Sequence, residues 1–124
     1  MLRRANRFHG HNSLRYVYKT GQTVRSDLFG LKYGQNQRRT DMRCAVVVSK
    51  KVSKSAVKRN RMRRRLYELI RTIILPDQPM DIVLTVFHES TATIPIDQLQ
   101  EQLRALLKKT NIAVKVEDKT RDTI

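Results

Sequence analysis

The chain has 124 residues, of which 26 are lysine or arginine and 11 are aspartate or glutamate, so its formal net charge is +15 at pH 7. The length suggests one domain, and a hydrophobic share of 40% is sufficient for a compact core. Because so much positive charge makes a folded domain repel itself, the composition indicates a polyanionic partner. Nucleic acid is the first candidate, and an anionic membrane surface is the second.

The membrane interpretation finds little support in the sequence. The longest apolar stretches, 45–48 and 82–87, are far shorter than the roughly 20 residues that a spanning helix needs. No apolar signal-peptide segment follows the basic residues 1–10. Cys44 is the only cysteine and cannot form an internal disulfide. These features predict a protein of the reducing cytoplasm.

The first third of the chain predicts an arm, a helix and one or two strands. Residues 1–11 are basic and are expected to be extended. A helix is expected from residue 12 to Gly21, because Leu14, Val17 and Tyr18 have the spacing of one helical face. Residues 22–34 alternate as a strand does, with two faces: Phe29, Leu31 and Tyr33 on one, and Leu28, Gly30 and Lys32 on the other.

The middle of the chain predicts a loop, a strand and a long helix. Residues 34–41 are polar and predict a loop, whereas 42–49 predict a strand whose apolar run suits a central position covered on both faces. Residues 55–75 predict the strongest helix, which Ser53 or Ser55 can cap. Its apolar residues recur at helical spacing: Met62, Leu66, Leu69, Ile70 and Ile73.

The last third predicts a strand over 81–88 and an amphipathic helix over 95–109. The resulting order of elements predicts a single-domain α+β sandwich, in which helices pack on a small central sheet. We expect this domain to cover residues 12–110, between the basic arm 1–11 and a polar, frayed tail over 111–124.

Residues 50–71 carry ten basic side chains and one acid, Glu68. Helical geometry places four residues roughly opposite the apolar stripe, with Arg61 and Arg65 beside them: Asn60, Arg64, Tyr67 and Arg71. A charged helix face is often merely solvated. Like charges four residues apart destabilise a helix, however, and arginine's planar fork donates two parallel bonds to phosphate. A run of nearly one sign therefore favours contact with nucleic acid.

Residues 46–68 resemble the signature of the bacterial ribonuclease P protein family. The matching residues are Ser49-Lys50-Lys51, Ala56-Val57, Arg59-Asn60-Arg61, Arg63-Arg64 and Glu68. The N-terminal part also resembles the opening helix of that family, through Asn6-Arg7-Phe8, Leu14, Val17, Tyr18 and Gly21. Four positions depart from the family pattern: a serine (Ser53 or Ser55) replaces the glycine before Ala56, Tyr67 replaces an arginine, and Leu14 and Lys32 replace aromatic residues.

The resemblance implies a ribonucleoprotein endoribonuclease that removes the 5′ leader of precursor tRNA. The implied partners are the catalytic RNA, whose phosphates hold Mg²⁺ and which carries the active site, and precursor tRNA. The protein alone would bind no cofactor and would be a monomer. The family fold has a left-handed β-α-β crossover like that of a ribosomal protein domain, whereas the general rule for such connections is right-handed.

The resemblance also implies two sets of binding residues. The catalytic RNA would contact seven of them: Lys50, Lys51, Arg59, Asn60, Arg61, Arg63 and Arg64. The 5′ leader would lie in a cleft between the sheet and the basic helix, lined by six others: Leu14, Tyr18, Phe29, Lys32, Tyr33 and Tyr67. A single strand needs such a basic groove with flat side chains on which bases stack, although core packing is the alternative role for Tyr18 and Phe29.

No catalytic or metal-binding set is predicted within the chain itself. His9, His11 and His88 lack metal-ligand spacing with Cys44, which is expected to be a small core residue. Two other functions remain open. A non-catalytic RNA-binding protein of ribosomal or chaperone type fits the charge equally well, whereas a DNA-binding helix fits less well because the basic helix also carries a strong core stripe.

Overall fold

The structure, a computed structural model, describes residues 17, 19 and 21–115. Residues Leu14 and Tyr18 and the arm 1–11 lie outside the described residues. The described elements are four strands, two α-helices and one 3₁₀ helix, in this order: β1 (Gln22–Arg25), β2 (Phe29–Gln35), β3 (Arg43–Val47), α2 (Ala56–Ile73), β4 (Met80–Val86), η2 (Glu89–Ala92) and α3 (Ile96–Leu107).

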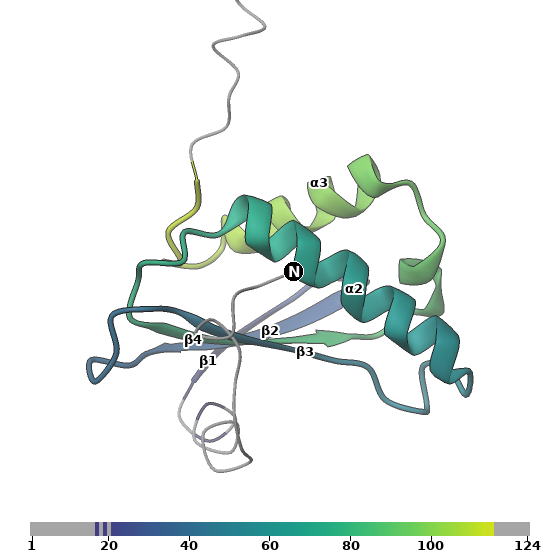
Figure 1. Cartoon of the computed structure of the whole chain (residues 1–124), viewed down its shortest axis with the longest axis horizontal. Helices are drawn as coiled ribbons and strands as arrows, with labels where there is room; N and C mark the ends of the chain where they lie inside the picture. Colours follow the sequence, from purple (N-terminus) through teal and green to yellow (C-terminus); the bar gives the residue numbers. More distant parts are fainter. Residues whose placement is uncertain (1–16, 18, 20, 116–124) are drawn as a thin grey trace, which may run out of the picture.

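The strands form one mixed sheet in the order β1-β2-β4-β3. β2 is antiparallel to both of its neighbours, whereas β3 and β4 are parallel. Helices α2 and α3 both cover the same face of this sheet (Figure 1). The arrangement confirms the predicted α+β sandwich with a long basic helix after the first strands.

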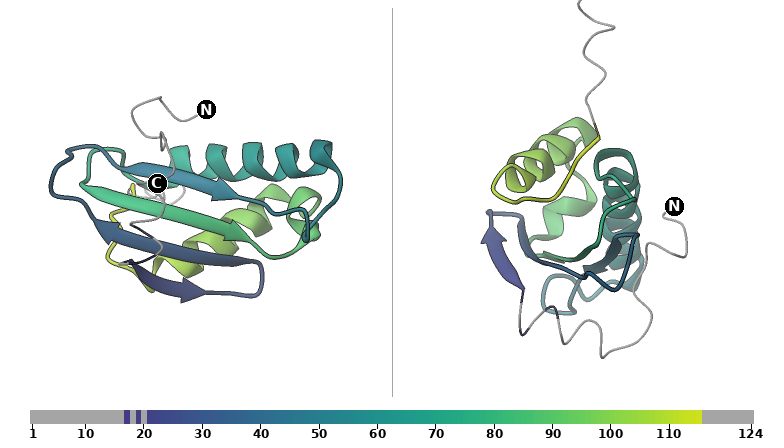
Figure 2. Two further views of the ribbon diagram at one scale, coloured as in Figure 1. Left: turned by 90° about the horizontal axis from the view of Figure 1, so that it is seen from below. Right: turned by 90° about the vertical axis from the view of Figure 1, so that its left-hand side faces the viewer.

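The parallel pair β3 and β4 is joined through α2, which makes a β-α-β crossover. Viewed from the face without α2 and α3, with the strands pointing right, β4 lies below β3 and α2 lies behind the sheet (Figure 2). This connection is left-handed, as the family resemblance implied and against the general right-handed rule.

The core fills the space between the sheet and the two helices. β2 contributes Phe29, Leu31 and Tyr33, which pair across the sheet with Val86, Leu84 and Ile82 of β4. From above, the apolar stripe of α2 packs onto them, and all five predicted stripe residues are buried: Met62, Leu66, Leu69, Ile70 and Ile73. The helical period therefore predicted the buried stripe of α2 correctly, and the strand period of 2 correctly grouped the three β2 residues on one face.

One strand assignment was wrong. The 42–49 segment was expected in the centre of the sheet, but β3 lies at its edge, and the more apolar β4 lies between β2 and β3. Six of the seven residues of β4 are buried, whereas Arg43, Ala45 and Val47 of β3 are half-buried. The crossover through α2 returns the chain to the inner position of β4, which the apolar character of the 81–88 segment also indicates.

The helix start was predicted closely and the tail was not. The Ser55 side chain accepts a hydrogen bond from the backbone N–H of Lys58, at 3.2 Å, and caps α2. Residues 111–115 are not frayed, because the backbone N–H of Leu75 donates to Ala113 O at 3.1 Å. The buried Gln78 amide also bonds to Ala113, donating to its carbonyl at 2.8 Å and accepting from its N–H at 3.0 Å.

A buried ion pair closes one end of the sheet. The Arg43 guanidinium donates twice to Asp81, at 3.0 and 2.9 Å, and Asn36 donates to the same carboxylate at 3.0 Å. Only 3% of the Asp81 side chain is exposed. Asp81→Ala should therefore lower the free energy of unfolding by about 3–5 kcal/mol, because the largely buried Arg43 guanidinium, whose side chain is 12% exposed, loses its counter-charge. Urea unfolding tests this, with the exposed Asp77→Ala as control; equal effects for both variants would contradict it.

Candidate nucleic-acid interface

The side of α2 that faces away from the core is centred on Arg61 and Arg64. Both side chains are exposed, as are Val57 and Glu68 on the same side. Tyr67 was expected to belong to this outward side, and the structure corrects that expectation. Its hydroxyl accepts a hydrogen bond from the backbone N–H of Val46 at 3.0 Å, so the half-buried ring turns towards β3.

Two arginines of α2 hold neighbouring loops in place. Arg59 donates to the carbonyl of Ser53 at 2.9 Å and braces the 49–55 loop against the first turn of the helix. Arg65 donates to the carbonyls of Thr91, at 2.7 Å, and Ile94, which flank the end of η2. Both side chains are half-buried, so much of their hydrogen-bonding capacity is used within the protein.

Two further cations of α2 are neutralised locally. Lys58 forms an ion pair with Glu89 of η2 at 2.6 Å. Arg71 pairs with Glu68 one turn earlier, at 2.8 Å, and this contact lowers the pKa of the Glu68 carboxyl below its usual value. The second half of the helix therefore carries less uncompensated positive charge than the first half.

Five basic side chains of α2 and the 49–55 loop are exposed and have no ion pair or hydrogen bond with the residues that the structure describes. We call them the basic ridge: Lys50, Lys51, Lys54, Arg61 and Arg64. Asn60, also exposed and one turn before Arg64, accepts a hydrogen bond from Arg63 at 2.5 Å. The ridge contains four of the seven residues predicted to contact the catalytic RNA, and Asn60 and Arg63 lie beside it.

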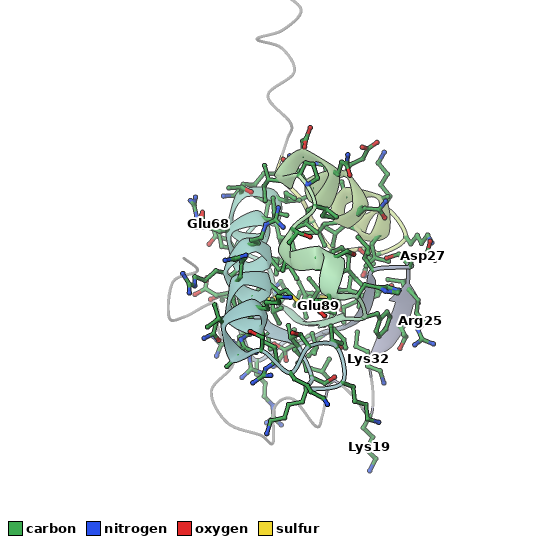
Figure 3. All side chains as sticks on the ribbon, turned by 90° about the vertical axis from the view of Figure 1, so that its right-hand side faces the viewer. Lys19, Arg25, Asp27, Lys32, Glu68 and Glu89 are labelled. Carbon is green, nitrogen blue, oxygen red and sulfur yellow. The ribbon has the colours of Figure 1, made fainter. Side chains whose placement is uncertain are left out.

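The second surface is the face of the sheet opposite α2 and α3, which we call the outer sheet face. Lys32 of β2 lies on it, opposite Val83 of β4 and Thr23 of β1. Figure 3 shows Lys32 and Lys19 extending on this side, away from the two helices. Lys32 is half-buried, whereas Leu31 and Tyr33 on either side of it are buried.

The structure does not place Phe29 and Tyr33 on the lining of a cleft, as was predicted for leader-binding residues. Phe29 is 0% exposed and Tyr33 is 5% exposed, and both side chains lie on the helix-covered face. The Tyr33 hydroxyl donates to the side-chain oxygen of Gln22 at 2.9 Å. The space between the sheet and α2, where the cleft was expected, is filled by the core. The alternation placed Phe29 and Lys32 on opposite faces correctly, but it could not show which face the helices cover.

Sequence reasoning also missed two residues of the outer sheet face, Phe87 and Arg25. The guanidinium carbon of Arg25 lies 5.1 Å from the centroid of the Phe87 ring. Phe87 was hidden in the sequence because 82–87 reads as one apolar run. The signal that could have found it is parity, since Phe87 follows the core residue Val86 and must point to the opposite face.

Cys44 is fully buried, as predicted for a small core residue, and burial raises the pKa of its thiol. Within the described residues, no three His, Cys, Asp or Glu side chains gather in a way that could hold a metal ion. None of the described helices combines the length and the apolar character needed to cross a membrane.

Comparison with known proteins agrees with both the motif and the fold. A family model described as Ribonuclease P matches residues 2–111. A ribonuclease P protein component of Chloroflexus aurantiacus is 37% identical over 110 residues, covering 87% of this chain and 79% of the relative. One from a Synechococcus species is 30% identical over 123 residues, covering 90% and 97%.

Solved structures show the same fold. A mutant of the Staphylococcus aureus RNase P protein superimposes with a TM-score of 0.75 at 24% identity, covering 87% of this chain and 90% of that one. The RNase P protein of Thermotoga maritima gives 0.71 at 21% identity, covering 85% and 97%. The match of the family model over nearly the whole described domain, together with these relatives, shows that the chain belongs to the family of bacterial ribonuclease P protein components.

Proposed function

We propose that this chain binds the RNA of ribonuclease P and the 5′ leader of precursor tRNA, and so assists removal of the leader to give the mature 5′ end. The observation that carries the proposal is the basic ridge, whose five cations lack partners within the described part of the chain. Exposed arginine and lysine groups held on a rigid helix and its preceding loop suit a phosphate backbone of fixed shape.

The two surfaces suit two RNA strands. The ridge, with Arg59, Asn60 and Arg63 beside it, would contact the catalytic RNA. Lys32 would contact the leader on the outer sheet face, and Leu14 and Tyr18 remain predicted leader contacts. The parallel strands β3 and β4 finish at the same end of the sheet. The 49–55 loop follows β3 at that end and leads into α2, so it lies where the outer sheet face and the ridge approach each other. Lys50 and Lys51 can therefore neutralise phosphates of both strands where they converge.

In this proposal the RNA carries the active site, and its phosphates would hold the Mg²⁺ that supplies an activated water for phosphodiester hydrolysis. The protein supplies affinity and position: it neutralises phosphate charge and holds the leader in register. We propose that the free protein is a monomer and acts in the cytoplasm.

A cleavage assay at low magnesium tests the proposal. The assay combines a ribonuclease P RNA from a relative such as Chloroflexus aurantiacus with 5′-labelled precursor tRNA, with and without this protein. We expect cleavage at the mature 5′ end only when RNA and protein are both present. Binding to RNA without restored cleavage by any cognate RNA would favour the non-catalytic RNA-binding alternative.

A further inference from the structure

The Phe87 side chain lies across the outer sheet face at the end of β4. Its backbone N–H donates to Leu28 O at 2.9 Å, which continues the ladder between β4 and β2 by one residue. The ring is half-buried, yet it belongs neither to the core nor to the half-buried residues packed against the core. Core packing therefore does not account for an aromatic residue here.

Gly30 makes room for this ring. A β-carbon at Gly30 would lie 2.7 Å from Cζ of Phe87, well inside van der Waals contact. Arg25, the cross-strand partner of Gly30 on β1, places its guanidinium over the ring. Three neighbouring strands therefore build this pair. β2 contributes Gly30, which has no side chain, the end of β4 contributes the Phe87 ring that occupies the space, and β1 contributes the Arg25 guanidinium over the ring.

The surroundings of this pair are positively charged. Lys32 lies two residues beyond Gly30 on the same face, and Lys109 approaches the Arg25 carbonyl with its ammonium group at 3.5 Å. Val47 at the end of β3 pairs with Thr85, two residues before Phe87. The residues that follow β3 therefore lie beside Phe87, and they lead directly to Lys50 and Lys51 of the basic ridge. An anionic strand that crosses the outer sheet face meets this corner on its way to the ridge.

We propose that Phe87 and Arg25 form a stacking site for one unpaired base of the precursor tRNA leader. The inference rests on the proposed function and assigns to it two residues that the signature motif does not contain. Unpaired RNA bases stack on aromatic rings and on arginine guanidinium planes, and a joined pair offers a larger flat surface than either alone. Such stacking tolerates any base, because every base has a π-face.

Removing single bases from the leader tests the site directly. Equilibrium binding would be measured between the RNA–protein holoenzyme and precursor tRNAs in which each leader nucleotide in turn is abasic. The wild-type holoenzyme should lose about five- to tenfold in affinity at one leader position. In Phe87→Ala the intact precursor should bind that much more weakly, and the abasic change at that position should then have no further effect. Equal sensitivity of wild type and Phe87→Ala to every abasic substitution would overturn the site.

Gly30 provides a second test that does not depend on losing the ring. Gly30→Ala should displace Phe87 and reduce leader affinity about as much as Phe87→Ala, whereas the double variant should be no weaker than Phe87→Ala alone. Additive losses would instead show that Gly30 and Phe87 act independently. Binding of mature tRNA and of the catalytic RNA should stay at the wild-type level in all three variants, and a common loss would reassign Phe87 to a structural role.

The outcomes separate this site from the proposed function. If the wild-type holoenzyme does not prefer leader-bearing precursor to mature tRNA, the proposed function itself fails, and the stacking site fails with it. If wild type shows the preference and Phe87→Ala retains all of it, only the stacking site is refuted. The exposed Val114→Ala, which removes apolar surface from the segment after α3, should behave as wild type.

Discussion

Phe29→Ala should lower the free energy of unfolding by about 3–5 kcal/mol, the usual cost of truncating a buried phenylalanine to alanine. Phe29 has no exposed surface and pairs with Val86 in the middle of the core. Its removal leaves a cavity beneath α2 and α3 that a packed interior fills only in part. Urea-induced unfolding followed by circular dichroism would measure the loss.

A second, more conservative variant decides between the two roles considered for Phe29, core packing and leader binding. Phe29→Leu, which keeps most of the apolar volume, should cost less and should bind leader-bearing precursor as well as wild type does. Val57→Ala is the stability control, because Val57 is 68% exposed and should change the free energy of unfolding by no more than about 0.5 kcal/mol. A stable Phe29→Leu protein that selectively loses the leader would restore Phe29 to the RNA-binding surface.

The elements of this fold could be predicted from local patterns, but the sheet order could not. The stripe from Met62 to Ile73 and the alternation of Phe29 and Leu31 against Lys32 reflect helix and strand periods within one segment. The inner position of β4 depends on a left-handed crossover of the whole chain. Because α2 and α3, the α-helices with described bounds, lie on the same face of the sheet, an error about the covered face placed Phe29 and Tyr33 at the surface rather than in the core.

The basic helix shows the same division between local and long-range information. Sequence spacing identified its arginines as a group, but it could not separate those that bind carbonyls from those that remain exposed. Arg65 reaches Thr91 and Ile94, which are 26 and 29 residues away in the chain. Arg61, one turn before Arg65 on the same helix, and its neighbour Arg64 are exposed instead. Only the packing of η2 against α2 distinguishes the two kinds of arginine.

Ion pairs within the protein also determine where its net positive charge is exposed, which the overall value of +15 does not show. The pairs with Glu68 and Glu89 neutralise Arg71 and Lys58, and the pair with Asp81 neutralises Arg43. These three acids form their ion pairs within the protein and do not neutralise the ridge. The cations of the ridge can therefore bind an external anionic partner. A phosphate backbone supplies negative charge at a regular spacing and releases its own counterions on binding.

Removing the two ridge arginines together should therefore have the largest effect on RNA affinity. Arg61→Ala with Arg64→Ala should weaken binding to the catalytic RNA about 10- to 100-fold at low salt, because two charge-assisted contacts to phosphate are lost. The slope of log affinity against log salt should become shallower by about 1.4–1.8, at 0.7–0.9 per phosphate contact. Both side chains are exposed and make no contact with the core, so stability should stay at the wild-type level.

A charge-matched variant on another surface separates the effect of losing the ridge contacts from the effect of lowering the net charge. Lys108→Ala with Lys109→Ala removes the same two charges from the end of α3, where both side chains are exposed. If the ridge binds the catalytic RNA, this control should lose only a few-fold in affinity and keep most of the wild-type salt slope. Equal losses of affinity in the two double variants would mean that the RNA responds to the overall electrostatic field of the protein. The ridge would then not be the contact site of the catalytic RNA.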